Sequence, residues 1–132
     1  MANFSLSQRS ENNMQGVNPL LIQLARRAIK LTKIDFGIPT TGGKRDAETQ
    51  HGLYLTVNNE KGPDGYEIVG KHQKGEALDY YGYVEGKASW KKEHLSQIAA
   101  AFLQAAIDMN IKIHWGGLFS NWTDMPHVEL VD

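Results

Sequence analysis

Three residues with side chains suited to metal binding are the most informative feature of the sequence: His72, Asp79 and His127. Two histidines and one carboxylate hold zinc in tetrahedral geometry and leave the fourth position open for water, which is the arrangement of catalytic zinc. Asp124 lies three residues before His127, and a carboxylate that is not a ligand can accept a proton from that water. The sequence therefore predicts a catalytic zinc centre with Asp124 as its base.

Two turns must bring these side chains together. His72 and Asp79 converge only if the residues between them turn, and Gly75 permits the turn because glycine adopts backbone conformations that other residues avoid. Asp124 and His127 flank Pro126, so a tight bend can aim both side chains into one cleft. We expect both bends in the structure.

Composition bounds the class of protein. A chain of 132 residues has room for one domain, which we place at residues 1–132. The net charge of −1 gives no electrostatic basis for nucleic acid or an anionic membrane as a partner. The sequence contains no cysteine, so disulfides and thiolate ligands are excluded and any zinc must be held by histidine and carboxylate.

The first ten residues lack the apolar run of a secretory signal, and no stretch approaches the roughly 20 apolar residues of a membrane span. We therefore expect the protein to accumulate in the cytosol of the cell that makes it.

Three helices are expected. Asn18 followed by Pro19 is typical of a helix start, and apolar residues recur at helical spacing over residues 19–31. Asp46 can cap a short helix over residues 47–55. The longest helix is expected over residues 91–109, where one face is apolar, and Asn110 is a plausible stop.

Strands and loops fill the remainder. Residues 35–39, 77–84, 111–115 and 127–131 have the composition or alternation of strands, and residues 56–70 have that of a loop. We expect a turn over residues 85–87 between the second strand and the long helix. Together these elements predict an α+β domain in which helices flank an antiparallel sheet.

The motifs resemble those of a known family in order and spacing. These are residues 43–50, 72–79, 113–117 and 124–130, together with residues 4–10 near the amino terminus. They resemble phage endolysins of the L-alanyl-D-glutamate peptidase type, relatives of the zinc D-Ala-D-Ala carboxypeptidases and dipeptidases. The family pattern S-x-H-x-x-G-x-A-x-D is matched at His72, Gly75, Ala77 and Asp79, whereas Gly70 stands where serine is usual.

The resemblance implies a D-Ala-D-Ala carboxypeptidase-like fold, zinc as the cofactor, and roles for individual residues. His72, Asp79 and His127 match the zinc ligands, and Asp124 matches the catalytic carboxylate. Arg45 matches an arginine that polarises the scissile carbonyl or holds the substrate. Lys44 is also basic, but Arg45 keeps the family's spacing to Gln50, which matches a glutamine that supports the substrate region.

Other polar and aromatic residues have plainer interpretations. Glu129 alternates with His127 and either hydrogen-bonds a histidine or faces solvent. Asp64 suits a turn better than a second cation site. We expect side-chain packing, rather than substrate contact, from Trp115 and Trp122. The remaining histidines have no partner at ligand spacing and are expected outside the site: His51, His94 and His114.

Three functions are consistent with these observations. The first is a phage lysis endopeptidase that cuts the L-Ala–D-Glu bond of the peptidoglycan stem peptide, acts as a monomer, and reaches the wall once the host's inner membrane is permeabilised. The second is a D,D-carboxypeptidase or dipeptidase acting on D-Ala-D-Ala. The third is a non-catalytic peptidoglycan-binding module, which Asp124 disfavours because binding alone needs no base.

Overall fold

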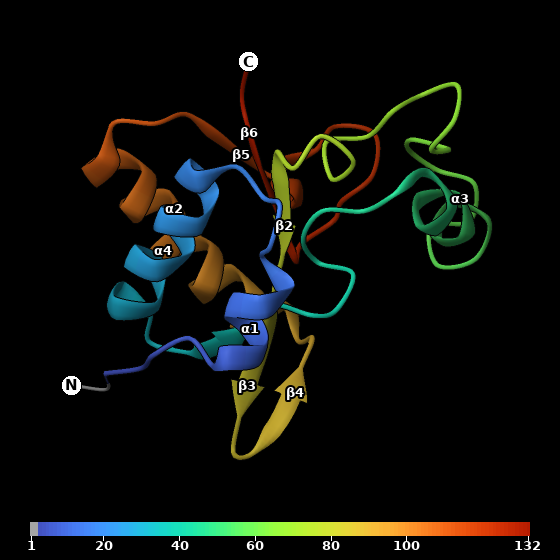
Figure 1. Ribbon diagram of the computed structural model, residues 1–132. Helices are drawn as coiled ribbons and strands as arrows, with labels where there is room; N and C mark the ends of the chain where they lie inside the picture. Colours follow the sequence, from blue (N-terminus) through green and yellow to red (C-terminus); the bar gives the residue numbers. More distant parts are fainter. Residues whose placement is uncertain (1–2) are drawn as a thin grey trace.

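The computed structural model describes residues 3–132, which contain both helices and strands (Figure 1). The helices are α1 (Gln8–Asn13), α2 (Pro19–Leu31), α3 (Ala47–Leu55), α4 (Lys92–Met109) and a 3-10 turn, η1 (Gly116–Leu118). The strands are β1 (Asp35–Gly37), β2 (Ala77–Asp79), β3 (Tyr81–Val84), β4 (Lys87–Ser89), β5 (Ile113–Trp115) and β6 (His127–Leu130). In these residues, no helix combines the length and the apolar character needed to cross a membrane.

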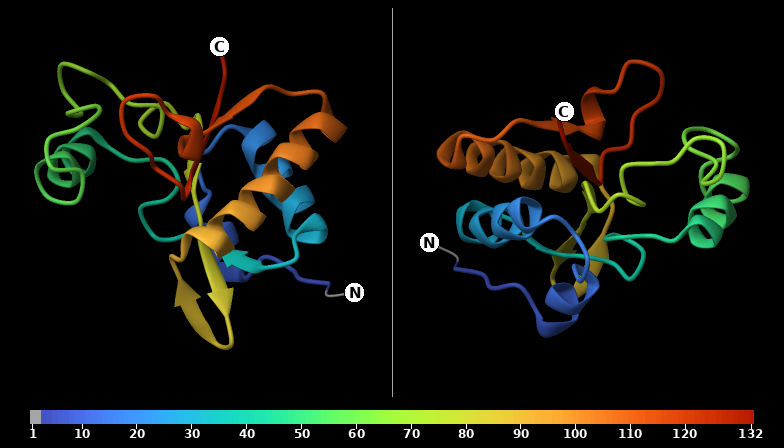
Figure 2. Two further views of the ribbon diagram at one scale, coloured as in Figure 1. Left: turned by 180° about the vertical axis from the view of Figure 1, so that it is seen from behind. Right: turned by 45° about the horizontal axis from the view of Figure 1, so that its top comes forward.

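The core forms where α2 packs against α4 and both cover the strands (Figures 1 and 2). The side chain of Asn18 accepts a hydrogen bond from the Leu20 amide and so starts α2 as expected. The apolar faces of the two helices are buried, with Leu24 and Phe102 fully inaccessible to solvent. Asn110 ends α4 in the left-handed conformation.

The strands form two three-stranded antiparallel sheets, ordered β1-β3-β4 and β2-β6-β5. The α+β class is thus confirmed, but the single strand expected over residues 77–84 is wrong. The chain changes partners at Tyr80, because Asp79 pairs with His127 of β6 whereas Tyr81 pairs with Gly37 of β1. A change of partner leaves the alternation of side chains intact, so the sequence pattern did not reveal it.

Besides the 3-10 turn η1, two short elements were not expected. Helix α1 is capped by Ser7, whose hydroxyl accepts a hydrogen bond from the Ser10 amide. Its six residues carry no apolar face, so periodicity gave no signal. Strand β4 follows a tight turn in which Glu85 and Gly86 both have positive φ, the conformation that joins two hairpin strands.

Helix α3 and the loop that follows it project from the main body (Figure 2). The bounds of α3 match the prediction, and the Asp46 side chain caps it by accepting a hydrogen bond from the Thr49 amide. Gln50 is the buried residue of this helix among those described. The apolar core therefore contributes little to the position of α3, which instead forms one wall over the site.

Candidate active site

The structure brings His72, Asp79 and His127 together. Asp79 ends β2 and His127 begins β6, and the antiparallel register places the two residues directly opposite each other. His72 lies in the preceding turn, which reverses at Gly75 with a φ of 72°. A side chain at Gly75 would meet the Gly16 carbonyl, so both the turn and its packing require glycine.

In each imidazole, the outer nitrogen, meaning the one that points away from the cluster, has a hydrogen-bond partner. Nδ1 of His72 lies 2.9 Å from the carbonyl oxygen of Gly43, which can only accept, so this nitrogen carries the proton. Nε2 of His127 lies 2.8 Å from Oε1 of Glu129. Both outer nitrogens therefore donate, and Nε2 of His72 and Nδ1 of His127 are left facing each other at 3.2 Å.

Asp79 is held in the same manner by its outer oxygen. Oδ2 accepts a hydrogen bond from Nη2 of Arg45 at 2.7 Å, while Oδ1 lies 3.1 Å from each of the two inward imidazole nitrogens. Arg45 is itself fixed, because Nε donates to the Thr41 carbonyl at 2.7 Å and Nη1 to Gln50 Oε1 at 3.0 Å.

The donor set fits a zinc ion. With both histidines neutral, three acceptor atoms face one another at 3.1 to 3.2 Å, an arrangement that requires a cation between them. Tetrahedral bonds of about 2.0 to 2.1 Å place two ligand atoms about 3.3 Å apart. These three residues, His72, Asp79 and His127, form a cluster within the described chain that could hold a metal ion.

Charge interactions within the cluster shift its pKa values. Burial would raise the pKa of Asp79, but His72 and His127 outweigh it and hold that pKa well below its usual range. Burial would lower the pKa of His127, but the carboxylates of Asp79 and Glu129 raise it to about 9. In the metal-free protein a proton on His127 therefore takes the place of the cation.

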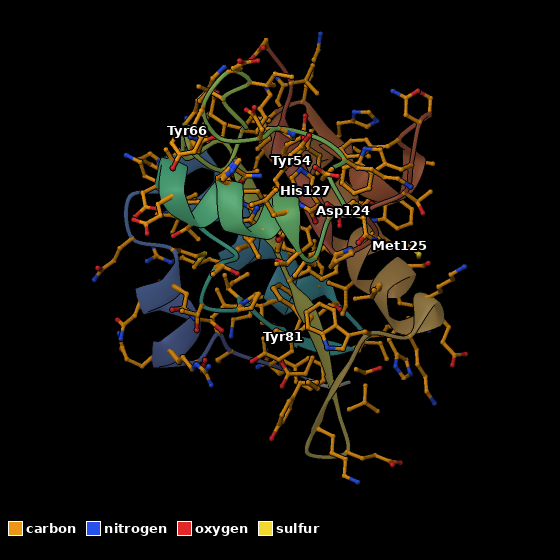
Figure 3. The ribbon with its side chains drawn as sticks, turned by 90° about the vertical axis from the view of Figure 1, so that its right-hand side faces the viewer. Tyr54, Tyr66, Tyr81, Asp124, Met125 and His127 are labelled. Carbon is orange, nitrogen blue, oxygen red and sulfur yellow. The ribbon has the colours of Figure 1, made fainter. Side chains whose placement is uncertain are left out.

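Asp124 lies beside the cluster, close to His127 (Figure 3), with its Oδ2 3.8 Å from Nδ1 of His127. Its position is set by the backbone, because its amide donates to the Gly116 carbonyl at 2.9 Å and its own carbonyl accepts from the His127 amide. Burial, followed by the charge of Asp79, raises the pKa of Asp124. A carboxylate with a raised pKa next to a metal centre is suited to accept and return a proton.

The cluster opens into a cavity of about 450 Å³ between α3 and the main body. Its walls combine polar residues around the cluster with apolar and aromatic ones farther out: Pro39, Thr41, Arg45, Gln50, Leu53, Val57, Asn58, Pro63, Gly70, Lys71, Trp90, Phe119, Trp122, Asp124, Pro126 and Glu129. Sequence reasoning missed Trp90. The signal that could have identified it is its setting in the sequence, where a single tryptophan stands between polar residues just before the long helix.

The remaining predicted residues take the following positions. Trp115 packs against the core and donates to the Met125 carbonyl at 2.7 Å, whereas Trp122 packs against Phe119 and also lines the cavity. A side chain at Gly70 would contact Pro63 at 3.1 Å, so serine there would require a small shift.

The other histidines lie outside the cluster. Nδ1 of His51 lies 2.9 Å from the Asp64 carbonyl and Nδ1 of His94 lies 2.6 Å from Ser89 Oγ, whereas His114 packs edge-on against Phe119. Asp64 has the turn role expected of it, because its Oδ1 accepts hydrogen bonds from three successive backbone amides, those of residues 66 to 68.

Comparisons with known proteins agree with this geometry. The model of the phage L-alanyl-D-glutamate peptidase family matches residues 1–131. The L-alanyl-D-glutamate peptidase of Escherichia phage T5 is 30% identical over 143 residues, covering 97% of this chain and 98% of that protein. The crystal structure of the Serratia marcescens L-Ala D-Glu endopeptidase ChiX superposes with a TM-score of 0.83 at 28% identity, covering 98% of this chain and 90% of that one.

Proposed function

The chain belongs to the phage L-alanyl-D-glutamate peptidase family, and from this premise we propose that it is a zinc-dependent endopeptidase that hydrolyses the L-Ala–D-Glu bond of the peptidoglycan stem peptide. The observation that carries the proposal is the convergence of three inward-facing acceptor atoms, with a fourth carboxylate beside them, at the base of a cavity. Membership in a peptidase family disfavours the non-catalytic module. No feature of the cavity favours the D,D-carboxypeptidase.

His72, Asp79 and His127 would hold the zinc through Nε2, Oδ1 and Nδ1, the atoms that face inward. A bound zinc ion supplies a Lewis acid and lowers the pKa of water to about 7. Gly43, Arg45 and Glu129 orient the three ligands through their outer atoms. Such partners fix the ring orientation and the protonated nitrogen before a metal arrives.

Asp124 accepts the proton of the attacking water and returns it to the departing amine of D-Glu. Its half-buried position beside His127 places it within reach of the cluster without making it a ligand. Its raised pKa suits the first step, since a carboxylate with a higher pKa accepts a proton more readily, and the departing amine is basic enough to take that proton back.

Arg45 has two roles in this proposal. Its hydrogen bond to Oδ2 leaves Oδ1 of Asp79 as the inward-facing oxygen. A guanidinium has five N–H donors, and three are engaged with Thr41, Gln50 and Asp79. Because Arg45 lines the cavity, the remaining donors can polarise the scissile carbonyl, while Gln50 keeps the guanidinium in place.

The site of action is part of the proposal. As a phage lysis enzyme the protein would be made in the host cytosol and act as a monomer on the stem peptide after the inner membrane is permeabilised. The kinship with the phage T5 peptidase supports this assignment.

The test uses purified peptidoglycan sacculi. Zinc-loaded protein should release new amino groups without releasing reducing sugar ends, chelation should stop the reaction, and added zinc should restore it. His72→Ala should lose both the metal and the activity. Full activity after complete chelation, or full zinc occupancy in His72→Ala, would rule out the zinc centre.

A further inference from the structure

Trp90 and Tyr81 form a pair of neighbouring aromatic rings, of which Trp90 lines the cavity. Trp90 lies between β4 and α4, lines the same cavity as the metal cluster, and remains 55% exposed. Its ring centroid lies 5.9 Å from that of Tyr81, with the rings tilted by 39°. In Figure 3, which looks onto this side, Tyr81 lies below His127 and Asp124.

The wall beside this pair is rigid and is tied to the metal cluster. The Asp79 amide donates to the Gly42 carbonyl at 2.8 Å, and the Gly42 amide donates to the Pro39 carbonyl at 2.9 Å. The Thr41 carbonyl accepts from Arg45 Nε. The turn of residues 39–42 therefore has a fixed position relative to Asp79, and Pro39 and Thr41 line the cavity.

Tyr81 is held against the sheet at a fixed distance from the ligands. It lies opposite Gly37 in the ladder, and a Cβ at Gly37 would come within 2.6 Å of its hydroxyl oxygen, so the ring occupies the space that a side chain would fill. Tyr81 begins β3 two residues after Asp79 ends β2, and two residues of extended chain span at most about 7 Å. The ring of Trp90 is the neighbour of the Tyr81 ring and lines the cavity.

This spacing matches the substrate on the acyl side of the scissile bond. If the L-Ala–D-Glu bond is cut, as the proposed function requires, the L-Ala nitrogen is joined through a lactyl group to the muramyl sugar. The chain from the scissile carbonyl to the sugar ring has the length of about two residues, or about 7 Å when extended. A sugar ring attached there would lie about as far from the scissile carbonyl as two residues of chain place Tyr81 from Asp79, and Trp90 packs against Tyr81 at that point.

From this agreement we infer that Trp90, supported by Tyr81, forms a subsite for the muramyl sugar and makes the enzyme prefer glycan-linked stem peptides to free ones. The C–H groups on one face of a pyranose carry partial positive charge and stack on the negative face of an indole. The exposure of Trp90 suits this occupant, because a glycan strand continues beyond the muramyl residue in both directions and needs an open platform.

The experiment compares two substrates with the same tripeptide, one linked to the GlcNAc–MurNAc disaccharide and one capped with an N-acetyl group on L-Ala. The readout is the ratio of their kcat/KM values for zinc-loaded enzyme. Wild type should favour the disaccharide substrate, and Trp90→Ala should lower the ratio by about tenfold. Trp90→Phe keeps an aromatic face and should retain most of the preference for the disaccharide substrate. Tyr83→Ala, an exposed aromatic on the same strand outside the cavity, should keep the wild-type ratio.

The outcomes separate this inference from the proposed function. If wild type cuts both substrates but Trp90→Ala slows them equally, the tryptophan has a structural role only and the subsite is refuted. An unchanged ratio in Trp90→Ala also refutes it. If wild type cuts neither substrate at the L-Ala–D-Glu bond, the proposed function itself fails.

Discussion

The Nε2 atom of His127 lies 2.8 Å from Oε1 of Glu129, and this contact determines which nitrogen of the imidazole faces the metal cluster. The Glu129 carboxylate accepts a hydrogen bond from Nε2–H, so the lone pair of Nδ1 is directed inward. The alternation of β6 places both side chains on one face of the strand. Glu129 thus belongs to the site as the residue that orients His127.

Removing this carboxylate should weaken metal binding without unfolding the protein. Glu129→Ala is expected to lower zinc affinity by about 10- to 100-fold, as is typical when the partner of a ligand histidine is lost. Glu129→Gln keeps an acceptor oxygen and should lose less. The measurement is competition with a chromogenic chelator, with exposed Glu67→Ala as the control. Equal affinities in Glu129→Ala and wild type would show that Glu129 does not position His127.

Asp124→Asn should separate turnover from metal binding. The substitution keeps the size of the side chain but removes its ability to accept a proton, so zinc content should stay near one ion per chain while kcat falls by at least about 10²-fold. Steady-state kinetics together with elemental analysis provide the check. If activity stays near that of wild type, the base must be sought elsewhere, with Glu129 as the next candidate.

The stability of the metal-free protein should depend on pH through His127. Its pKa is raised to about 9 in the folded state, above its ordinary value of about 6.5. The stabilisation is therefore fully present below about pH 6.5 and is lost as the pH rises to about 9. Urea unfolding of chelated protein should show a decreasing free energy of unfolding across this range. The decrease should be smaller in Glu129→Ala, and identical pH profiles for the two proteins would contradict the assigned cause.

Tyr80 links the core to the site and should be sensitive to a small change. Its ring is fully buried, and its hydroxyl lies 2.9 Å from the Leu95 carbonyl and 2.8 Å from that of Met125, next to Asp124. Tyr80→Phe deprives these carbonyls of a donor and should lower the free energy of unfolding by about 1 to 3 kcal/mol. Tyr83→Phe, on an exposed part of β3, should have little effect. Equal denaturation midpoints for both variants would refute the role of the Tyr80 hydroxyl.

Helices α2, α3 and α4 were predictable because their end signals are local. Asn18 with Pro19, Asp46 and Asn110 each mark an end that the structure shows at the same place or within one residue. The partners of the strands were not predictable, because pairing joins residues far apart in the chain. The change of sheet at Tyr80 depends on the positions of β1 and β6, which no pattern within residues 77–84 contains.

Similar reasoning applies to the site. The spacing of His72, Asp79, Asp124 and His127 was sufficient to group them, and the structure brings the four together. The contact of Arg45 with Asp79 was not predictable, because the two residues meet only through the turn of residues 39–45. For Glu129, the alternation of side chains along the strand predicted that it shares a face with His127. Only the fold shows that this face points toward the cluster.

The most direct test of the central claim is mass spectrometry of the fragments released from purified peptidoglycan by zinc-loaded protein. The account predicts glycan strands that end in a free L-Ala carboxyl on each muramyl residue, and peptides that begin with a free D-Glu amine. Release of terminal D-Ala would favour a carboxypeptidase instead. New reducing sugar ends with intact stem peptides would contradict peptidase action altogether.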